Sequence, residues 1–181
     1  MTTRRRWLFH RTPGNVLVLA GIIAPVIFLL AFGAVNITTK MLQRAALEDA
    51  LRLASRSAVN QLAYASLAGN APQASAAGVR TAKQTGITTL VDTISGAPWA
   101  GWSDPVPGIL ESPTAMASRV VWQINPPSGQ CRFTDGSRFP GAPTTQPLVC
   151  AEVTLRMEAL VPGMGEWHPT IVAKETIDSL R

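Results

Sequence analysis

The chain has 181 residues, of which 46% are hydrophobic and 15% are charged. This composition excludes an intrinsically disordered chain, because disorder needs low hydrophobicity and a high net charge. The formal net charge of +5 would suit a nucleic-acid-binding protein, but four arginines lie within the first eleven residues. The rest of the chain has 12 basic and 11 acidic residues. The basic character therefore belongs to an N-terminal tag, and we expect no nucleic-acid partner.

A continuous apolar run follows the tag. Val16 to Val35 contains no charged side chain, and about 20 residues rising ~1.5 Å each match the ~30 Å hydrocarbon core of a bilayer. Because basic residues collect on the cytoplasmic side of a span, the tag places the N-terminus in the cytoplasm. We expect a leader over residues 1–14, a lipid-embedded transmembrane helix over residues 15–39 and a single-pass protein of the cell membrane. A cleaved secretory signal is the alternative, although its apolar core is normally only ~7–15 residues long.

Residues 40–68 are predicted to continue this helix outside the membrane, because they are rich in good helix formers. Small and apolar side chains recur there at intervals of three and four residues and form one face. The face consists of Leu47, Leu51, Ala54, Ala58, Leu62 and Ala65. It suits either packing against a partner helix or covering the core of its own domain, and the sequence leaves both open.

Residues 69–181 are predicted to form an extracytoplasmic α+β domain. Ser75–Thr85 is weakly helical, and Ile87–Ile94 fits a strand or a short helix. Strands are expected at Arg119–Ile124, Val149–Val161 and Pro169–Ile177. Apolar and polar residues alternate along the second strand. This alternation places one set of residues on a solvent-facing side, namely Cys150, Glu152, Thr154, Arg156 and Glu158. The predicted fold class is α+β, in which the extracytoplasmic amphipathic helix packs on a small antiparallel β-sheet.

Cys131 and Cys150 are predicted to form a disulfide. Both lie in the external part of the chain with 18 residues between them, and oxidising compartments favour disulfides. A metal site would need further ligands that are not nearby; two buried free thiols are the other alternative. Because Cys150 falls on the predicted solvent face, we expect the bond to lie outside the main core and to be accessible to reductant.

The sequence offers little for catalysis. It has two histidines, His10 in the tag and His168 next to a tryptophan, and no nucleophile-elbow, zinc-protease, P-loop or dinucleotide motif. We predict no catalytic residue, no metal, no cofactor and no enzyme. Trp99 and Trp102 form a candidate ligand surface, because tryptophan combines an apolar body with a polar tip. They support an alternative function, a membrane-anchored extracellular ligand-binding module, unless they fill the core.

The N-terminal third resembles the TadE- and TadG-like proteins of bacterial tight adherence (Flp-type) pilus systems. Gly14 and Asn15 precede the apolar segment, Pro25 lies eleven positions after Gly14, and residues 42–46 read Leu-Gln-Arg-Ala-Ala. The resemblance covers about residues 4–68. At the fifth position after the glycine, TadE-like pseudopilins usually carry Glu; here it is Leu19, as in TadG-like chains, which removes one reason to expect polymerisation.

That resemblance implies a membrane-anchored, non-enzymatic accessory subunit, similar to a minor pseudopilin, of a tight adherence pilus or related secretion system. It also implies that the leader could be removed by cleavage at Gly14 and Asn15. It also implies other pilus or secretion subunits as partners, among them a paralogue bound through residues 42–65.

Overall fold

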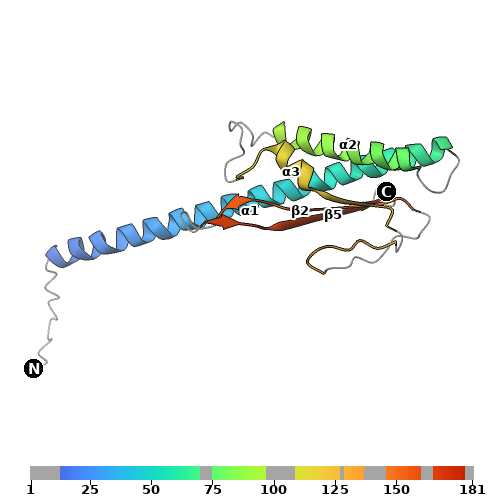
Figure 1. Ribbon diagram of the computed structural model, residues 1–181. Helices are drawn as coiled ribbons and strands as arrows, with labels where there is room; N and C mark the ends of the chain where they lie inside the picture. Colours follow the sequence, from blue (N-terminus) through green and yellow to red (C-terminus); the bar gives the residue numbers. More distant parts are fainter. Residues whose placement is uncertain are drawn as a thin grey trace, which may run out of the picture. The chain divides into compact units, whose positions relative to one another are not determined.

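The computed structural model describes residues 13–69, 75–96, 109–126, 129–136, 146–159 and 165–177, with the side chains of the first helix from Val18 to Tyr64. In chain order the elements are α1 (Pro13–Gly69), α2 (Ala76–Ser95), α3 (Pro113–Arg119), β1 (Val121–Ile124), β2 (Leu148–Thr154), β3 (Met157–Glu158), β4 (Glu166–Trp167) and β5 (Thr170–Thr176) (Figure 1). The chain divides into two compact units, residues 1–39 and 40–181. The predicted α+β class, with a long apolar N-terminal helix and a small antiparallel sheet, is confirmed.

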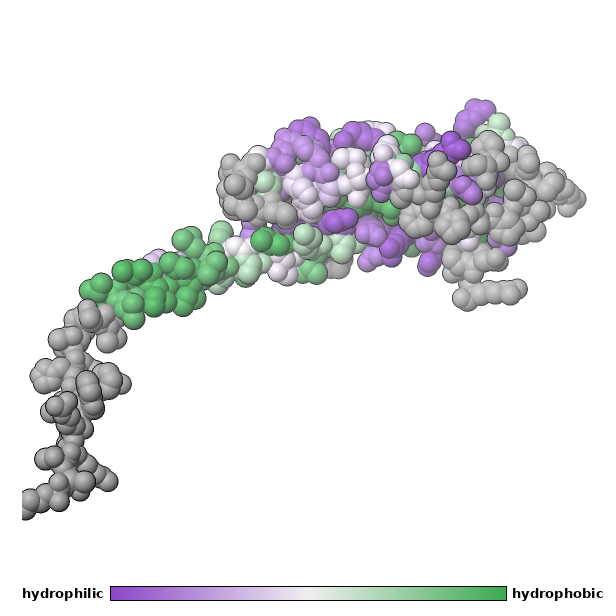
Figure 2. Space-filling view, turned by 90° about the horizontal axis from the view of Figure 1, so that it is seen from below, coloured by the Kyte–Doolittle hydropathy of each residue, from purple (hydrophilic) through white to green (hydrophobic). Residues whose placement is uncertain are grey.

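In the first unit, α1 exposes its large apolar side chains. Phe28 is 71% exposed and Leu30 is 69% exposed, and Figure 2 shows hydrophobic residues covering this part of the helix. Among the residues described, one helix is long and apolar enough to cross a membrane, and it is this one. The helix also continues without interruption into the second unit, as the sequence predicts.

In the second unit, one face of α1 is fully buried. Leu47, Leu51, Ala54, Ala58 and Leu62 are each 0% exposed. The first three share a hydrophobic cluster with side chains of α2, α3, β2 and β5, and the last two share a second cluster with α2 and β2. Of the two roles that the sequence leaves open, this face therefore has the second, covering the core of its own domain. Ala65 lies outside the side chains described.

Residues 76–95 form one helix, α2, rather than two elements. Its N-cap is Ser75, whose hydroxyl accepts a hydrogen bond from the Gly78 amide at 3.1 Å. Its buried residues recur at every fourth position: Ala82, Gly86, Leu90 and Ile94. The helix expected over Ser75–Thr85 is confirmed, and the strand alternative for Ile87–Ile94 is wrong because that segment extends the same buried face.

Gly86 allows α2 to pass close to the sheet. A Cβ atom at this position would lie 2.7 Å from the Cη2 atom of Trp122 on β1, which is well inside normal van der Waals contact. The absence of a side chain is thus what lets the tryptophan ring pack beneath the helix.

The strand predicted at Arg119–Ile124 begins later than expected, because the short helix α3 precedes it. The Ser112 hydroxyl caps α3 by accepting from the Ala115 amide at 3.2 Å, and Pro113 occupies the first turn. Arg119 therefore ends a helix, and β1 starts at Val121. Seven residues are too few to show a helical period in the sequence.

The main sheet has β2 at its centre, in the order β1-β2-β5, with both neighbours antiparallel. Cys150 pairs with Gln123 on one side and Lys174 on the other. The third predicted strand, Pro169–Ile177, is confirmed as β5. β3 and β4 form a separate two-stranded sheet in which Met157 lies opposite Trp167.

The prediction of one strand over Val149–Val161 with a solvent face is wrong in both respects. The strand β2 ends at Thr154, and the chain resumes pairing only as the short β3. All residues of β2 from Leu148 to Val153 are buried. One side meets the helices, while Cys131 and Phe133 pack on the opposite side. The alternation of residues within β2 cannot reveal that its second side is covered, because the covering residues belong to another segment of the chain.

Candidate functional site

Lys40 joins the start of the second unit to β3. Its side chain is 6% exposed. The ammonium donates to the main-chain carbonyls of Glu158 at 3.1 Å and Ala159 at 2.6 Å, and it lies 3.5 Å from the Glu158 carboxylate. A buried charge is tolerated when its donors are satisfied in this way. No sequence motif signals this contact, since it joins residues more than 100 positions apart.

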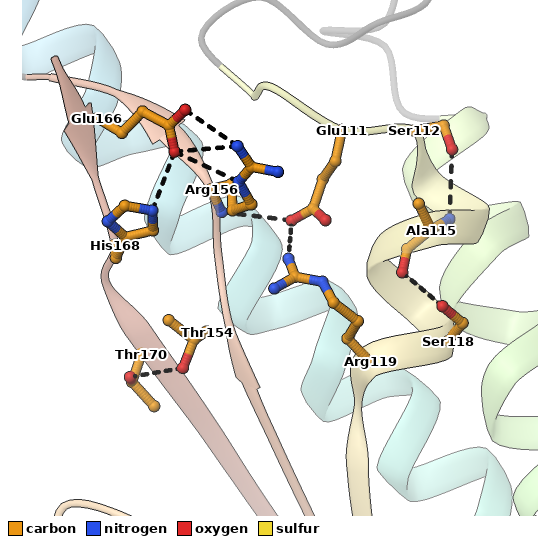
Figure 3. Close-up of polar contacts among 10 residues, drawn as sticks. All are labelled: Glu111, Ser112, Ala115, Ser118, Arg119, Thr154, Arg156, Glu166, His168 and Thr170. Carbon is orange, nitrogen blue, oxygen red and sulfur yellow. Dashed lines mark hydrogen bonds and ion pairs between the residues drawn. The ribbon is translucent and has the colours of Figure 1, made fainter.

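A series of ion pairs, here the ion-pair chain, links α3 to β4 (Figure 3). Arg119 donates to the carboxylate of Glu111, which also accepts from the main-chain amide of Arg156 at 3.3 Å. The Arg156 guanidinium donates to Glu166 at 3.0 Å. His168 completes the chain with its Nε2 atom 3.0 Å from Glu166. His168 stands out in the sequence as one of two histidines, but no sequence pattern indicates its partner or the other four residues of the ion-pair chain.

The pairing of Arg156 with Glu166 stabilises both charged forms. The hydrogen bond from Arg156 lowers the pKa of Glu166, with a smaller contribution from His168. The same hydrogen bond and the adjacent carboxylate raise the pKa of Arg156. Both side chains face solvent, where screening weakens ion pairs. The pair therefore orients β4 against the β2–β3 connection more than it stabilises the fold.

Stability should decrease on acidification through the titration of Glu166. Its pKa in the folded state lies below the ordinary 4.5, so the unfolded state binds the proton first. The contribution is complete above pH 4.5 and is lost as the pH falls through the folded-state pKa. Denaturant unfolding as a function of pH should show a shallower acid slope for Glu166→Gln than for the wild type, with Asp49→Asn as an exposed control. Equal slopes in wild type and Glu166→Gln would contradict this assignment.

The hydroxyl groups near the ion-pair chain bond to other atoms. Ser118 donates to the Ala115 carbonyl at 2.7 Å, Ser112 caps α3, and Thr154 and Thr170 lie 3.1 Å apart (Figure 3). In the part of the chain that the structure describes, no group of three or more His, Cys, Asp or Glu residues is placed to hold a metal ion. What this geometry provides is a cross-link between α3, the β2–β3 connection and β4.

The predicted disulfide between Cys131 and Cys150 is present, with the two Cα atoms 5.9 Å apart. It ties the segment after β1 to the start of β2. The Gln123 side chain strengthens the same connection by accepting from the Arg132 amide at 3.1 Å and donating to its carbonyl. The bond belongs to a cluster separate from the main core, as expected.

The expectation that reductant reaches this bond is wrong. Both cysteines are 0% exposed, because neighbouring side chains enclose them. These are Phe133, Leu148 and Val172. The error follows from the wrong assignment of Cys150 to a solvent-facing side of β2.

Glu152 is buried for the same reason, at 3% exposure. Its carboxylate accepts from the Thr134 amide at 3.0 and 3.1 Å and from the Thr134 hydroxyl. These donors replace the water that a carboxylate loses on burial. Together with the disulfide, they hold residues 131–136 over the sheet.

The remaining candidate residues are not brought into a common site. Gly14 and Asn15 lie in the first turn of α1, and their processing stays a prediction. Trp99 and Trp102 lie outside the described residues. A shallow depression of about 420 Å³ lies along the surface of α2. It is lined by Arg80, Thr81, Lys83, Gln84 and Ile87.

Comparison of the chain with protein-family models, with curated proteins and with solved structures finds no match. The TadE/TadG-like resemblance therefore stays a prediction based on residues 4–68.

Proposed function

We propose that this protein is a membrane-anchored, non-enzymatic accessory subunit, similar to a minor pseudopilin, of a tight adherence pilus or a related bacterial secretion system. The main support for the membrane anchor is the difference in side-chain exposure between the two parts of α1. Apolar side chains before residue 39 are exposed, whereas the face between residues 47 and 62 is buried in the second unit. A long helix with exposed apolar side chains has the length and composition of a membrane span, which supports the proposed lipid anchor. The same helix then holds the second unit at the outer surface of the cell membrane.

The outer face of α1 is the surface proposed for a partner subunit or paralogue within residues 42–65. Leu42, Leu53 and Tyr64 are 66%, 47% and 70% exposed. They recur every eleven residues, close to three helical turns, so they follow one line along the helix. The opposite face of α1 is occupied by the domain's own core. A partner helix would therefore bind along the exposed line of these three side chains.

Gene deletion tests the proposal. We expect a deletion strain to lose surface pili in electron micrographs and to adhere less, and the wild-type chain to restore both. The double variant Ile23→Arg/Ile27→Arg should fail to restore them, because each arginine in hydrocarbon costs ~3 kcal/mol. Ile23→Leu/Ile27→Leu is the matched control and should restore both. Unchanged piliation and adhesion after deletion would overturn the proposed role.

A further inference from the structure

Along the exposed face of α1, side chains recur at alternating intervals of four and three residues. This spacing keeps them on one narrow stripe of the helix, and two helices pair along such a stripe in a coiled coil. The stripe, here the outer seam, consists of Leu42, Ala46, Asp49, Leu53, Arg56 and Asn60. None of these six residues is buried, whereas Leu51, on the opposite side of the helix, is 0% exposed.

The outer seam has few large apolar side chains. Leu42 and Leu53 are 66% and 47% exposed, so a helix that binds along the seam would cover both of them. The seam also contains the polar Asn60, and a polar residue within a seam selects the partner and the register at a cost in stability. Recognition along the outer seam therefore depends on matching polar groups as well as on apolar burial.

Two charges of opposite sign lie in the outer seam, seven residues apart. The side chains of Asp49 and Arg56 are 78% and 47% exposed. Their contacts within the chain are long, 3.9 Å between Arg52 and Asp49 and 3.8 Å between Arg56 and Glu175. Both distances are close to the outer limit for an ion pair, which is about 4 Å. Each charge can therefore form a closer pair with a side chain of a partner.

A second copy of this chain is a poor partner for the outer seam. Two copies that are anchored at their N-terminal ends in the same membrane have helices that run in the same direction. In a parallel pair each seam residue faces its own equivalent, so Asp49 faces Asp49 and Arg56 faces Arg56. Like charges that face each other across an interface disfavour the pair. An antiparallel pair would bring Asp49 close to Arg56, but it needs the two anchors at opposite ends.

We propose that the outer seam pairs with a different chain and not with a second copy. The partner is a helix anchored in the same membrane, with a basic side chain opposite Asp49 and, seven residues later, an acidic one opposite Arg56. Both repulsions of a self-pair then become ion pairs. The inference rests on the membrane anchor and the partner helix proposed above, and it adds the charges by which that partner is recognised.

Two forms of this chain, produced together, test the charge rule. Leu53→Cys provides the cross-linking thiol, since the two native cysteines are bonded and buried. One form keeps Asp49 and the other carries Asp49→Arg, with tags of different size, and both are oxidised in isolated membranes. The substitution changes an exposed side chain, and retention of the native disulfide checks that both forms fold. Leu110→Cys, at a residue that is 43% exposed in another segment, measures random collision.

We expect the mixed pair to cross-link severalfold more than either self-pair, because Asp49 then faces an arginine. Adding Arg56→Glu to the Asp49→Arg form should raise the mixed yield further. Equal yields in the mixed pair and the self-pairs would overturn the charge rule. Yields no higher than those of Leu110→Cys would overturn the seam as a pairing surface. Alkaline extraction of the same membranes tests the anchor separately.

A photoreactive benzoylphenylalanine in place of Leu53 tests the partner in the native host. The adduct should contain a peptide from another chain with a membrane span, and the captured helix should have a basic residue followed seven positions later by an acidic one. Asp49→Arg should lower the adduct yield severalfold. An adduct of two copies of this chain, or a captured helix without these charges, would overturn the proposal. The deletion phenotype described above tests the pilus role independently.

Discussion

Leu51→Ala should destabilise the second unit by ~2–5 kcal/mol. Leu51 is 0% exposed and belongs to the cluster that joins α1 to α2, α3 and the sheet. Removing its side chain loses buried apolar area and leaves a cavity between elements that cannot close independently. Leu53→Ala is the matched control, because Leu53 lies two positions further on the same helix and is 47% exposed. It should change stability by only ~0.5 kcal/mol.

Urea unfolding of the full chain in detergent micelles, followed by tryptophan fluorescence, measures both variants. A midpoint shift for Leu51→Ala with little change for Leu53→Ala is the expected result. Similar shifts in the two variants, or a larger one for Leu53→Ala, would contradict the assignment of the buried face of α1.

Removal of the disulfide should cost ~2–4 kcal/mol, because the reduced chain gains conformational freedom in its unfolded state. We expect Cys131→Ser and Cys150→Ser to loosen residues 131–136, visible as faster amide hydrogen exchange there. Membrane insertion should be unaffected. The double serine variant separates loss of the bond from the effect of one buried thiol left unpaired.

Burial also predicts how the native bond reacts. Because both cysteines are 0% exposed, reduction by a water-soluble thiol should be slow in the native state and should follow the unfolding rate. Mass spectrometry of alkylated, non-reduced peptides measures it. Rapid reduction in the native protein, or two free thiols in protein isolated from the cell envelope, would contradict this description.

The features that the sequence predicts correctly are those with a local physical signal. The helix of α1 follows from a long apolar run joined to a segment with regular spacing of small and apolar residues. The strand β5 follows from its β-branched composition. The pairing of Cys131 with Cys150 follows from their predicted compartment, since the spacing alone does not require a bond.

The features that the sequence does not predict depend on distant contacts. Ile87–Ile94 is rich in β-branched residues, yet Leu90 and Ile94 continue a helical face that begins at Ala82. A glutamate at position 152 is typical of an exposed strand position. It is buried because a distant segment, which includes Thr134, covers it and donates to its carboxylate. The same holds for the ion-pair chain, because its five members come from three separate stretches of the chain and have no common spacing.

The most direct test of the account is the sidedness of α1. Thr3→Cys and Tyr64→Cys, each in the full chain, would be treated with a membrane-impermeant maleimide in right-side-out membrane vesicles. Tyr64 is 70% exposed, so its cysteine should be modified in intact vesicles, whereas the cysteine at position 3 should react only after detergent permeabilisation. Modification of position 3 in intact vesicles, or protection of position 64 until permeabilisation, would contradict a helix that anchors the second unit outside the membrane.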